Sequence, residues 1–427
     1  MTGTGGSGPA AGRRLVLAGE AIADVAMRVP ALPERGGDML ATGSAVTAGG
    51  GFNVMAAAAR QGLPVLYAGG HGTGPWGDLV RAALAAEGIE VLRAPDPGRD
   101  TGFDVALVEP GGERSFVTHL GAEALPAPGS WDAVPLRAGD LVYVSGYGLA
   151  GPASGPVLSQ WAAALPEHVT LYLDPGPLVA GIPPAVLRPV LDRCDWLSCN
   201  QREALLLTAS PLFAASPEPS ETPPPGAGPS PGAELPSDVA PPPGAVPLPG
   251  PPPQRPSPNA SPGAELPSDV APPGAMPALN ARTSRPLDAE PSPEAGTPPD
   301  GVPPGAGSSA VDPAAVDAAR RLRAGTRRAQ VIVRVGAAGC LLALRPVPAQ
   351  QPGLVTSLPA PAVTAVDTTG AGDAHAGVFL AALAEGQDPA TAARRANTAA
   401  ALAVTRPGPA TSPSRSDLDA WLAVQAR

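Results

Sequence analysis

Short apolar runs alternate with alanine-rich or amphipathic segments over most of the chain. Apolar runs predict buried strands at residues 14–18, 63–68, 141–145, 169–173, 196–199, 331–335 and 340–344. Segments rich in alanine and other helix formers predict helices at residues 53–61, 76–87, 372–385 and 389–404. Strands that alternate with helices indicate βαβ units, so the fold class is α/β, with a mostly parallel sheet covered on both faces.

Two stretches depart from this pattern. Residues 26–46 and 101–119 contain short runs with polar alternation, and a Pro-Gly-Gly turn interrupts the second stretch at 110–112. They predict a small additional sheet, and ordinary surface hairpins are the alternative. A sheet that projects over the carboxyl ends of the main strands would cover the place where open α/β folds bind ligands.

Composition changes near residue 210 and changes back near residue 310. About half of the 60 prolines lie between these points, and the sequence SPGAELPSDVAPP occurs at 230–242 and again at 261–273. Such a segment cannot bury enough apolar surface to offset its ordering entropy. We expect a disordered insertion at 211–310, with docking of proline-recognising domains as the alternative. Residues 1–12 are expected to form a disordered tail.

Charge and composition exclude several functions. The formal net charge is −10, and all 28 basic residues are arginine, so no lysine is present for a Schiff base or a Walker-A loop. An acidic chain without a run of about 18 apolar residues argues against nucleic acid or a membrane as partner. The three cysteines have no clustered partner ligands, which argues against a zinc site and favours a reducing, cytoplasmic location.

The strongest candidate site is the glycine-rich turn VDTTGAGD at 366–373, which opens directly into a predicted helix. Gly370 and Gly372 permit tight backbone geometry. The first-turn amides, with the helix dipole behind them, form a site for an anion. Asp373 lies in that first turn, where capping of the helix is the alternative role.

Two further motifs follow predicted strands or precede predicted helices. In AGGGFN at 48–53, Asn53 can cap a helix and can also bind a polyol. In NQRE at 200–203, Asn200 and Glu203 lie on one face of a helix start. They can hold a hydrated Mg²⁺ through its waters, and a capping box is the alternative.

Together these motifs resemble those of the ribokinase-like, or PfkB, family of sugar and nucleoside kinases, over about 14–210 and 312–422. The resemblance implies one kinase domain at 13–210 and 311–427, a three-layer sandwich with a mostly parallel central sheet and a small β-sheet lid. It implies phosphorylation of a hydroxymethyl group on a sugar by ATP and Mg²⁺. Asp373 would be the base, and the turn Gly370, Ala371 and Gly372 would bind the transferred phosphoryl group.

The resemblance also assigns ligand contacts. Substrate contacts would come from Asp24, Gly49, Gly51, Asn53 and the lid residue Arg114. ATP contacts would come from Asn200, Glu203, Arg334, Gly336, Gly339 and Asn397. A K⁺ ion, whose requirement the resemblance leaves open, would lie among Asp367, Thr369, Ala403, Arg406, Gly408 and Ser412. Family members often dimerise through the lid, so the resemblance allows a homodimer and leaves the oligomeric state open.

Departures from ribokinases proper leave the acceptor open. Gly50 stands where lysine is usual, Met55 stands where alanine is usual, and Phe52 is bulky. The acceptor is expected to be a sugar of the ribose, fructose or related ketose class. Open alternatives are a nucleoside kinase, a catalytically silent sugar sensor or scaffold, and a dinucleotide-dependent oxidoreductase. For the last, the GHGTG run at 70–74 is an incomplete dinucleotide motif.

Overall fold

The computed structural model describes residues 12–110, 113–213, 311–345 and 355–425. The predicted tail, apart from Gly12, and the predicted insertion, apart from its first three residues, lie outside the described residues. Within the described part of the chain, no helix has the length and apolar character needed to cross a membrane.

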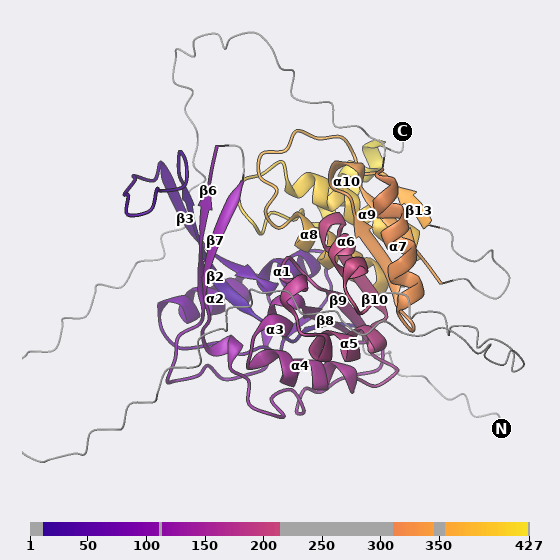
Figure 1. Ribbon diagram of the computed structural model, residues 1–427, viewed down its shortest axis with the longest axis horizontal. Helices are drawn as coiled ribbons and strands as arrows, with labels where there is room; N and C mark the ends of the chain where they lie inside the picture. The colour runs from indigo at the N-terminus through magenta and orange to yellow at the C-terminus, as the bar shows by residue number, and fades with distance from the viewer. Residues whose placement is uncertain (1–11, 111–112, 214–310, 346–354, 426–427) are drawn as a thin grey trace, which may run out of the picture. The chain divides into compact units, whose positions relative to one another are not determined.

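A nine-stranded sheet forms the centre of the described chain (Figure 1). All neighbouring strands pair in parallel except β11 with β12 and β12 with β13. The strands, in sheet order, are β13 (Val355–Leu358), β12 (Cys340–Ala343), β11 (Gln330–Arg334), β10 (Trp196–Asn200), β9 (Thr170–Asp174), β8 (Leu141–Ser145), β1 (Leu15–Leu17), β4 (Val65–Tyr67) and β5 (Glu90–Val91).

Both faces of this sheet are covered by helices. Side chains alternate along each strand, so that Val16 packs on one face, whereas Leu15 and Leu17 pack on the other. The face of Val16 is covered by α3 (Gly146–Ala150), α4 (Ser154–Ala163), α5 (Pro184–Arg193), α6 (Gln201–Ala209) and α7 (Pro313–Gly325). The opposite face is covered by α1 (Gly51–Arg60), α2 (Pro75–Ala86), α8 (Ala371–Ala384), α9 (Pro389–Ala403) and α10 (Arg415–Gln425). The predicted three-layer α/β fold is confirmed.

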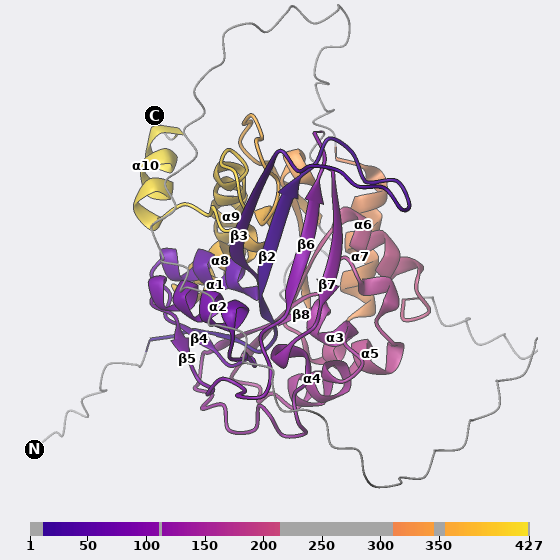
Figure 2. The same cartoon turned by 90° about the vertical axis from the view of Figure 1, so that its left-hand side faces the viewer.

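A separate sheet of four strands is also present (Figure 2). Its order is β3 (Gly43–Gly50), β2 (Ala21–Arg28), β6 (Phe103–Val108) and β7 (Arg114–His119). Strands β2 and β6 are parallel, and the outer pairs are antiparallel. The predicted bounds 26–46 were too narrow, because β2 and β3 stay paired down to Ala21 and Gly50. Asp24 and Gly49, which are predicted to contact substrate, therefore lie within β2 and β3.

The folded chain also continues past the predicted boundary at residue 210. Phe213 is 8% exposed, and a Cβ atom added at Gly325 would lie 2.5 Å from its ring. Helix α7 packs beside α6, and Gln201 Nε2 donates to Asp312 Oδ2 at 2.6 Å. The predicted boundary follows the proline content, which gives no sign that Phe213 is buried.

Candidate active site

Five polar residues gather at one edge of the main sheet. Parallel strands end at the same edge, and the residues stand at or just after the ends of β1, β8, β9, β10 and β11: Glu20, Ser145, Asp174, Asn200 and Arg334. The chain leaves β1 for β4 on one side and returns to β8 on the other. This is the switch point at which open α/β sheets bind ligands.

The turn before α8 requires glycine. Gly370 precedes the helix with φ of 71°, and a Cβ atom there would overlap the carbonyl oxygen of Pro409. The Ala371 amide donates to Thr368 O at 3.3 Å. The amides of Gly372 and Asp373 follow in the first turn, where no preceding helical carbonyl is available to accept them. They are the stronger anion donors of the predicted set.

Asp373 meets Asn53 because α1 and α8 pack closely. Gly377 of α8 lies against the α1 backbone, where an added Cβ atom would be 2.5 Å from Val54 O and 2.6 Å from Ala57 Cβ. This approach brings Asn53 Nδ2 to 3.1 Å from Asp373 Oδ2. Burial raises the pKa of Asp373 to about 6, although the bond from Asn53 opposes the rise.

The predicted substrate glycines make room for acidic residues. At Gly49, a Cβ atom would overlap the carboxylate of Asp24, and at Gly51 it would lie 2.6 Å from Glu20 O. Asp24 also has a partner that the sequence analysis missed, because Asp104 of β6 stands opposite it in the parallel ladder. Only the register of β2 and β6 reveals this pair, since 79 residues separate the two positions.

Glu20 is the second missed residue. Ser145 Oγ donates to its Oε1 at 2.6 Å, whereas Oε2 is buried and has no partner in the part of the chain that the structure describes. Burial raises the pKa of Glu20 to about 7, of Asp24 to about 8 and of Asp104 to about 6. Asp104 and Asp373 raise the pKa of Asp24 further, because like charges disfavour ionisation.

Arg334 lies on the other side of Asp373. Its Nη1 donates to Asp174 Oδ2 at 2.8 Å and to Ser198 Oγ at 2.9 Å. Its Nη2 is 3.8 Å from Glu203 Oε2. A Cβ atom added at Gly372 would lie 3.5 Å from the guanidinium carbon, so this cation borders the start of α8.

Asn200 and Glu203 form a capping box. Glu203 N donates to Asn200 Oδ1 at 2.9 Å, and Asn200 N and Nδ2 donate to the two carboxylate oxygens at 2.8 and 2.7 Å. Burial raises the pKa of Glu203. No cluster of three or more His, Cys, Asp or Glu side chains suited to a metal occurs in the described part of the chain. The capping alternative is present, and these two residues would reach Mg²⁺ only through water.

Arg114 points to Asp367 rather than to the acceptor residues. The two side chains form an ion pair, and Asp367 also accepts from Thr369 N at 2.8 Å, Thr369 Oγ1 at 2.7 Å and Gly408 N at 3.0 Å. Burial opposes the effect, but these hydrogen bonds and the Arg114 charge lower the pKa of Asp367. The ion pair with Asp367 does not support the prediction that Arg114 contacts substrate.

The other residues of the predicted K⁺ loop are also hydrogen-bonded within the chain. Ala403 O accepts from Arg406 N at 3.1 Å and from Thr411 Oγ1 at 3.0 Å. Arg60 Nη1 donates to Ser412 O at 3.1 Å. With Arg114 on Asp367, guanidinium groups contact two of the six predicted ligands. This donor set does not fit a bare K⁺ ion.

The residues predicted to contact the nucleotide differ in how accessible they are. Gly336 has φ of 61°, is exposed and has open space above it. At Gly339, with φ of 94°, a Cβ atom would overlap Leu358 O. Asn397 is 3% exposed, and its Nδ2 donates to Leu358 O at 2.8 Å. Gly339 and Asn397 thus join β12, β13 and α9, and Gly336 is the accessible member.

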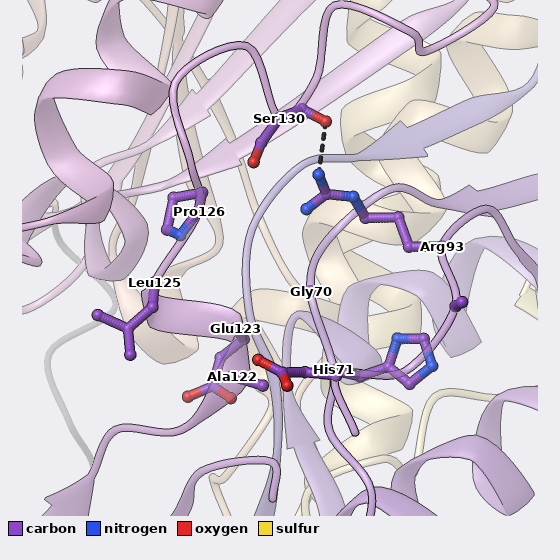
Figure 3. A pocket seen from close by; sticks show the side chains of 10 residues that line it. Gly70, His71, Arg93, Ala122, Glu123, Leu125, Pro126 and Ser130 are labelled. Atoms are coloured by element: carbon purple, nitrogen blue, oxygen red, sulfur yellow. Dashed lines mark hydrogen bonds between the residues drawn. The ribbon is translucent and has the colours of Figure 1, made fainter. Parts of the chain in front are cut away.

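A pocket of about 470 Å³ lies near the ends of β4 and β5 (Figure 3). Arg93 donates to Ser130 O at 2.7 Å across it, and Glu123 accepts from Gly121 N at 2.7 Å and Gly102 N at 2.9 Å. None of the predicted site residues lines this pocket.

The GHGTG run at 70–74 borders that pocket and precedes α2. The carboxylate of Asp100 already occupies the first amides of the helix, since Trp76 N and Gly77 N donate to it at 3.2 and 2.8 Å. A dinucleotide phosphate would need those amides. This cap removes the main structural support for the oxidoreductase alternative.

Comparison with known proteins shows the family of this chain. Residues 13–221 and 308–416 match the model of the pfkB family carbohydrate kinases. The chain belongs to the pfkB family of carbohydrate kinases. An uncharacterized sugar kinase of Escherichia coli K12, YegV, is 34% identical to this pfkB-family kinase over 196 residues, which are 44% of this chain and 59% of the relative's length. The match thus spans less than two thirds of that relative.

Solved structures share the fold of this pfkB-family kinase at low identity. Ribokinase from Thermotoga maritima matches with a TM-score of 0.62 at 18% identity, covering 96% of this chain and 99% of the other. Arabidopsis thaliana ribokinase, solved with ribose and ATP, matches with a TM-score of 0.61 at 21% identity and the same coverage. Aminoimidazole riboside kinase from Salmonella enterica, solved with its riboside and an ATP analogue, gives 0.58 at 18% identity, with 96% and 99% coverage.

Proposed function

We propose that the protein transfers the γ-phosphoryl group of ATP to a hydroxymethyl group of a sugar, with Asp373 as the base. The observation that carries this proposal is the position of Asp373 in the first turn of α8, 3.1 Å from Asn53 and bordered by Arg334. A proton acceptor thus adjoins amides and a cation that favour negative charge. The ATP-bound ribokinase of A. thaliana, which has the same fold, supports ATP as the donor.

The reaction needs positioning and charge stabilisation more than covalent chemistry. Asp373 takes the proton of the acceptor hydroxyl as its oxygen attacks the γ-phosphorus and the bond to the ADP oxygen breaks. The amides of Gly372 and Asp373 stabilise charge on the transferred group, and Arg334 adds a buried positive charge next to them. A chain without lysine can perform each of these roles.

Mg²⁺ would neutralise the β- and γ-phosphate oxygens when bound. Each oxygen of Glu203 accepts one hydrogen bond from Asn200 and retains a lone pair for a coordinated water. Glu203 and Asn200 therefore fit water-mediated contact. The predicted K⁺ loop does not fit its ion. Turnover measured in K⁺, Na⁺ and choline buffers tests that requirement.

A nucleoside acceptor is the second candidate. The aminoimidazole riboside kinase of S. enterica shares the fold and was solved with a riboside. A silent sugar sensor is a weaker candidate, because Asp373, Asn53 and the first-turn amides of α8 are all in place.

A homodimer through the small sheet is also proposed. Its inner face carries Asp24 and Asp104, so alternation places the neighbouring residues of each strand outward. One outward row is apolar and consists of Val25, Val46, Val105 and Val117, of which Val46 and Val117 are 46% and 72% exposed. The next outward row has Met27 and Leu107 at its centre and Ser44 and Ser115 at its edges. Val117→Asp is expected to shift the sedimentation mass from dimer to monomer, whereas a monomeric parent protein would contradict the proposal.

The first experiment is ADP release from Mg-ATP across pentoses, hexoses, ketoses and nucleosides, with Asp373→Asn as control. Acceptor-dependent ADP that disappears in the variant is the expected result, and the best acceptor separates sugar from nucleoside kinase. Sugar binding by folded protein without any ADP would favour the sensor and refute the proposed reaction.

A further inference from the structure

Four carboxylates surround the place of the proposed acceptor. Glu20, Asp24, Asp104 and Asp373 come from the loop after β1, from β2, from β6 and from α8. They lie close enough to interact electrostatically, since Asp24 is affected by Asp104 and Asp373, and Glu20 is affected by Asp373. Tyr147 of α3 is 48% exposed and its hydroxyl is close to the same group.

The buried acceptor atoms of this group await donors. Glu20 Oε2, Asp24 Oδ1 and Asp104 Oδ1 have no hydrogen-bond partner within the described residues. Asn53 Oδ1 is also without a partner, although its residue is 6% exposed and its Nδ2 is bonded to Asp373. Buried acceptors without partners destabilise a fold, so their concentration beside a reactive carboxylate indicates a ligand that supplies hydrogens.

Positive charge is directed away from these atoms. None of the four carboxylates takes part in an ion pair within the described residues. Arg334 pairs with Asp174 and approaches Glu203, and Arg114 pairs with Asp367. A carboxylate or phosphate on the acceptor would therefore meet oxygen atoms without a paired cation, and it would face like charge from Asp104 and Asp373, which are ionised above about pH 6.

We propose that the acceptor is a polyhydroxylated molecule without negative charge, a neutral or amino sugar rather than a sugar acid or sugar phosphate. This inference rests on the proposed function, because it assigns the acceptor of the same site. Sugar hydroxyls donate to the free oxygens of Glu20, Asp24, Asn53 and Asp104. The facing pair of Asp24 and Asp104 is the place where an ammonium group of an amino sugar binds.

A matched set of ligands tests the acceptor class. Full-length protein is assayed with D-glucose, D-glucosamine, D-gluconate and D-glucose 6-phosphate, and with D-fructose, D-fructose 6-phosphate, D-ribose and D-ribose 5-phosphate. ADP release with Mg-ATP and the thermal shift without ATP are both recorded. Turnover and stabilisation are expected only with neutral or amino members.

The outcomes separate this inference from the proposed function. Highest kcat/KM with a sugar acid or phosphate overturns the inference and leaves the kinase intact. No ADP with any ligand overturns the proposed function, and the thermal shifts then decide the inference. Stabilisation by neutral or amino sugars supports it, whereas stabilisation by anionic sugars alone, or by none of the set, overturns it.

Asp104→Asn tests the contribution of one charge without a change in shape. The ratio of Kd values for an anionic sugar and its neutral counterpart is expected to fall about tenfold, because one repelling charge is removed. Asp38→Asn is the control, since Asp38 is exposed in the loop between β2 and β3 and its variant should keep the parent ratio. An unchanged ratio in a folded Asp104→Asn variant overturns the role of Asp104. If that variant fails to fold, Asp24→Asn assayed at about pH 9, where Asp24 is ionised in the parent protein, provides the same test.

Discussion

The two sides of Asp373 solve the problem of buried charge differently. On the side of Arg334, each carboxylate of Asp174 and Glu203 has hydrogen-bond donors and a guanidinium nearby. On the side of Asp24, Asp104 and Glu20, carboxylate oxygens are buried without partners among the described residues. The carboxylates of the first side thus have partners without a ligand, and those of the second side do not. In the proposed function the second side binds the acceptor, so stability is given up where specificity is needed.

The largest expected effect is on the residue between the two sides. Asp373→Asn keeps the shape and the contact with Asn53 but removes the proton acceptor, so kcat should fall by roughly 10²–10⁴-fold. Steady-state ADP release measures the loss, and circular dichroism shows whether the fold is retained. Turnover close to that of the parent protein would remove Asp373 from the role of base.

The next effect concerns the side of Arg334. Arg334→Met leaves the carboxylates of Asp174 and Glu203 without their cation, which should reduce the free energy of unfolding by about 3–5 kcal/mol. Arg328→Met is the control, because Arg328 forms more exposed pairs with Glu167 and Asp195, which are worth about 1 kcal/mol or less. Urea denaturation measures both variants. Equal losses would mean that the buried ion pairs of Arg334 contribute no more to the free energy of unfolding than the exposed pairs of Arg328 do.

Activity should also follow the ionisation of Asp373. Its pKa is raised to about 6, and the base must be ionised, so kcat/KM should fall about tenfold for each pH unit below 6. ADP release from pH 5 to 8 measures this limb, with thermal unfolding at each pH to show that the protein stays folded. If kcat/KM falls only near about pH 4, the carboxyl group of Asp373 is not buried in the working enzyme.

The smaller of the two effects on stability tests the side of Asp24, Asp104 and Glu20. The folded-state pKa values of Asp24 and Glu20 are raised to about 8 and 7, so the native state holds protons that the unfolded state releases. Stability should therefore fall as pH rises from 6.5 to 8.5, by roughly 2–3 kcal/mol. Burial lowers the pKa values of His71 and His375, so these side chains contribute to the pH dependence of stability only below this window.

Thermal unfolding across that window measures the slope. Asp24→Asn should flatten it, because the variant has no proton to lose at this position. A slope that is identical in the two proteins would show that Asp24 is ionised throughout or titrates equally when unfolded.

The sequence predicted those parts of the site that rest on local chemistry. Asp373 and the turn before α8 follow from glycine spacing at a helix start, and Asn53 lies beside Asp373 because small residues let α1 and α8 approach. The main strands follow from apolar runs. Asp104 could not be predicted, because its partner Asp24 is set by the register of two strands far apart in sequence.

Two other assignments stay predictions, because each side chain has a partner that the sequence does not reveal. Arg114 was placed on the lid, but its partner Asp367 depends on how β7 lies over the loop before α8. Asn397 was assigned to the nucleotide from its position along the chain, yet its amide is used by the carbonyl of Leu358. Sequence identifies polar groups, but the partner of each group is a tertiary property.

The packing of α6 against α7 sets the distance between Phe213 and Asp312. The starts of the two helices meet at Gln201 and Asp312, and Phe213, beyond the end of α6, meets Gly325 at the end of α7. Phe213 and Asp312, which stand on either side of residues 214–310 in the sequence, therefore lie about the length of α7 apart, 13 residues or about 20 Å. Roughly six extended residues would span that distance. The packing of α6 against α7 thus requires only a small part of the sequence between these two residues.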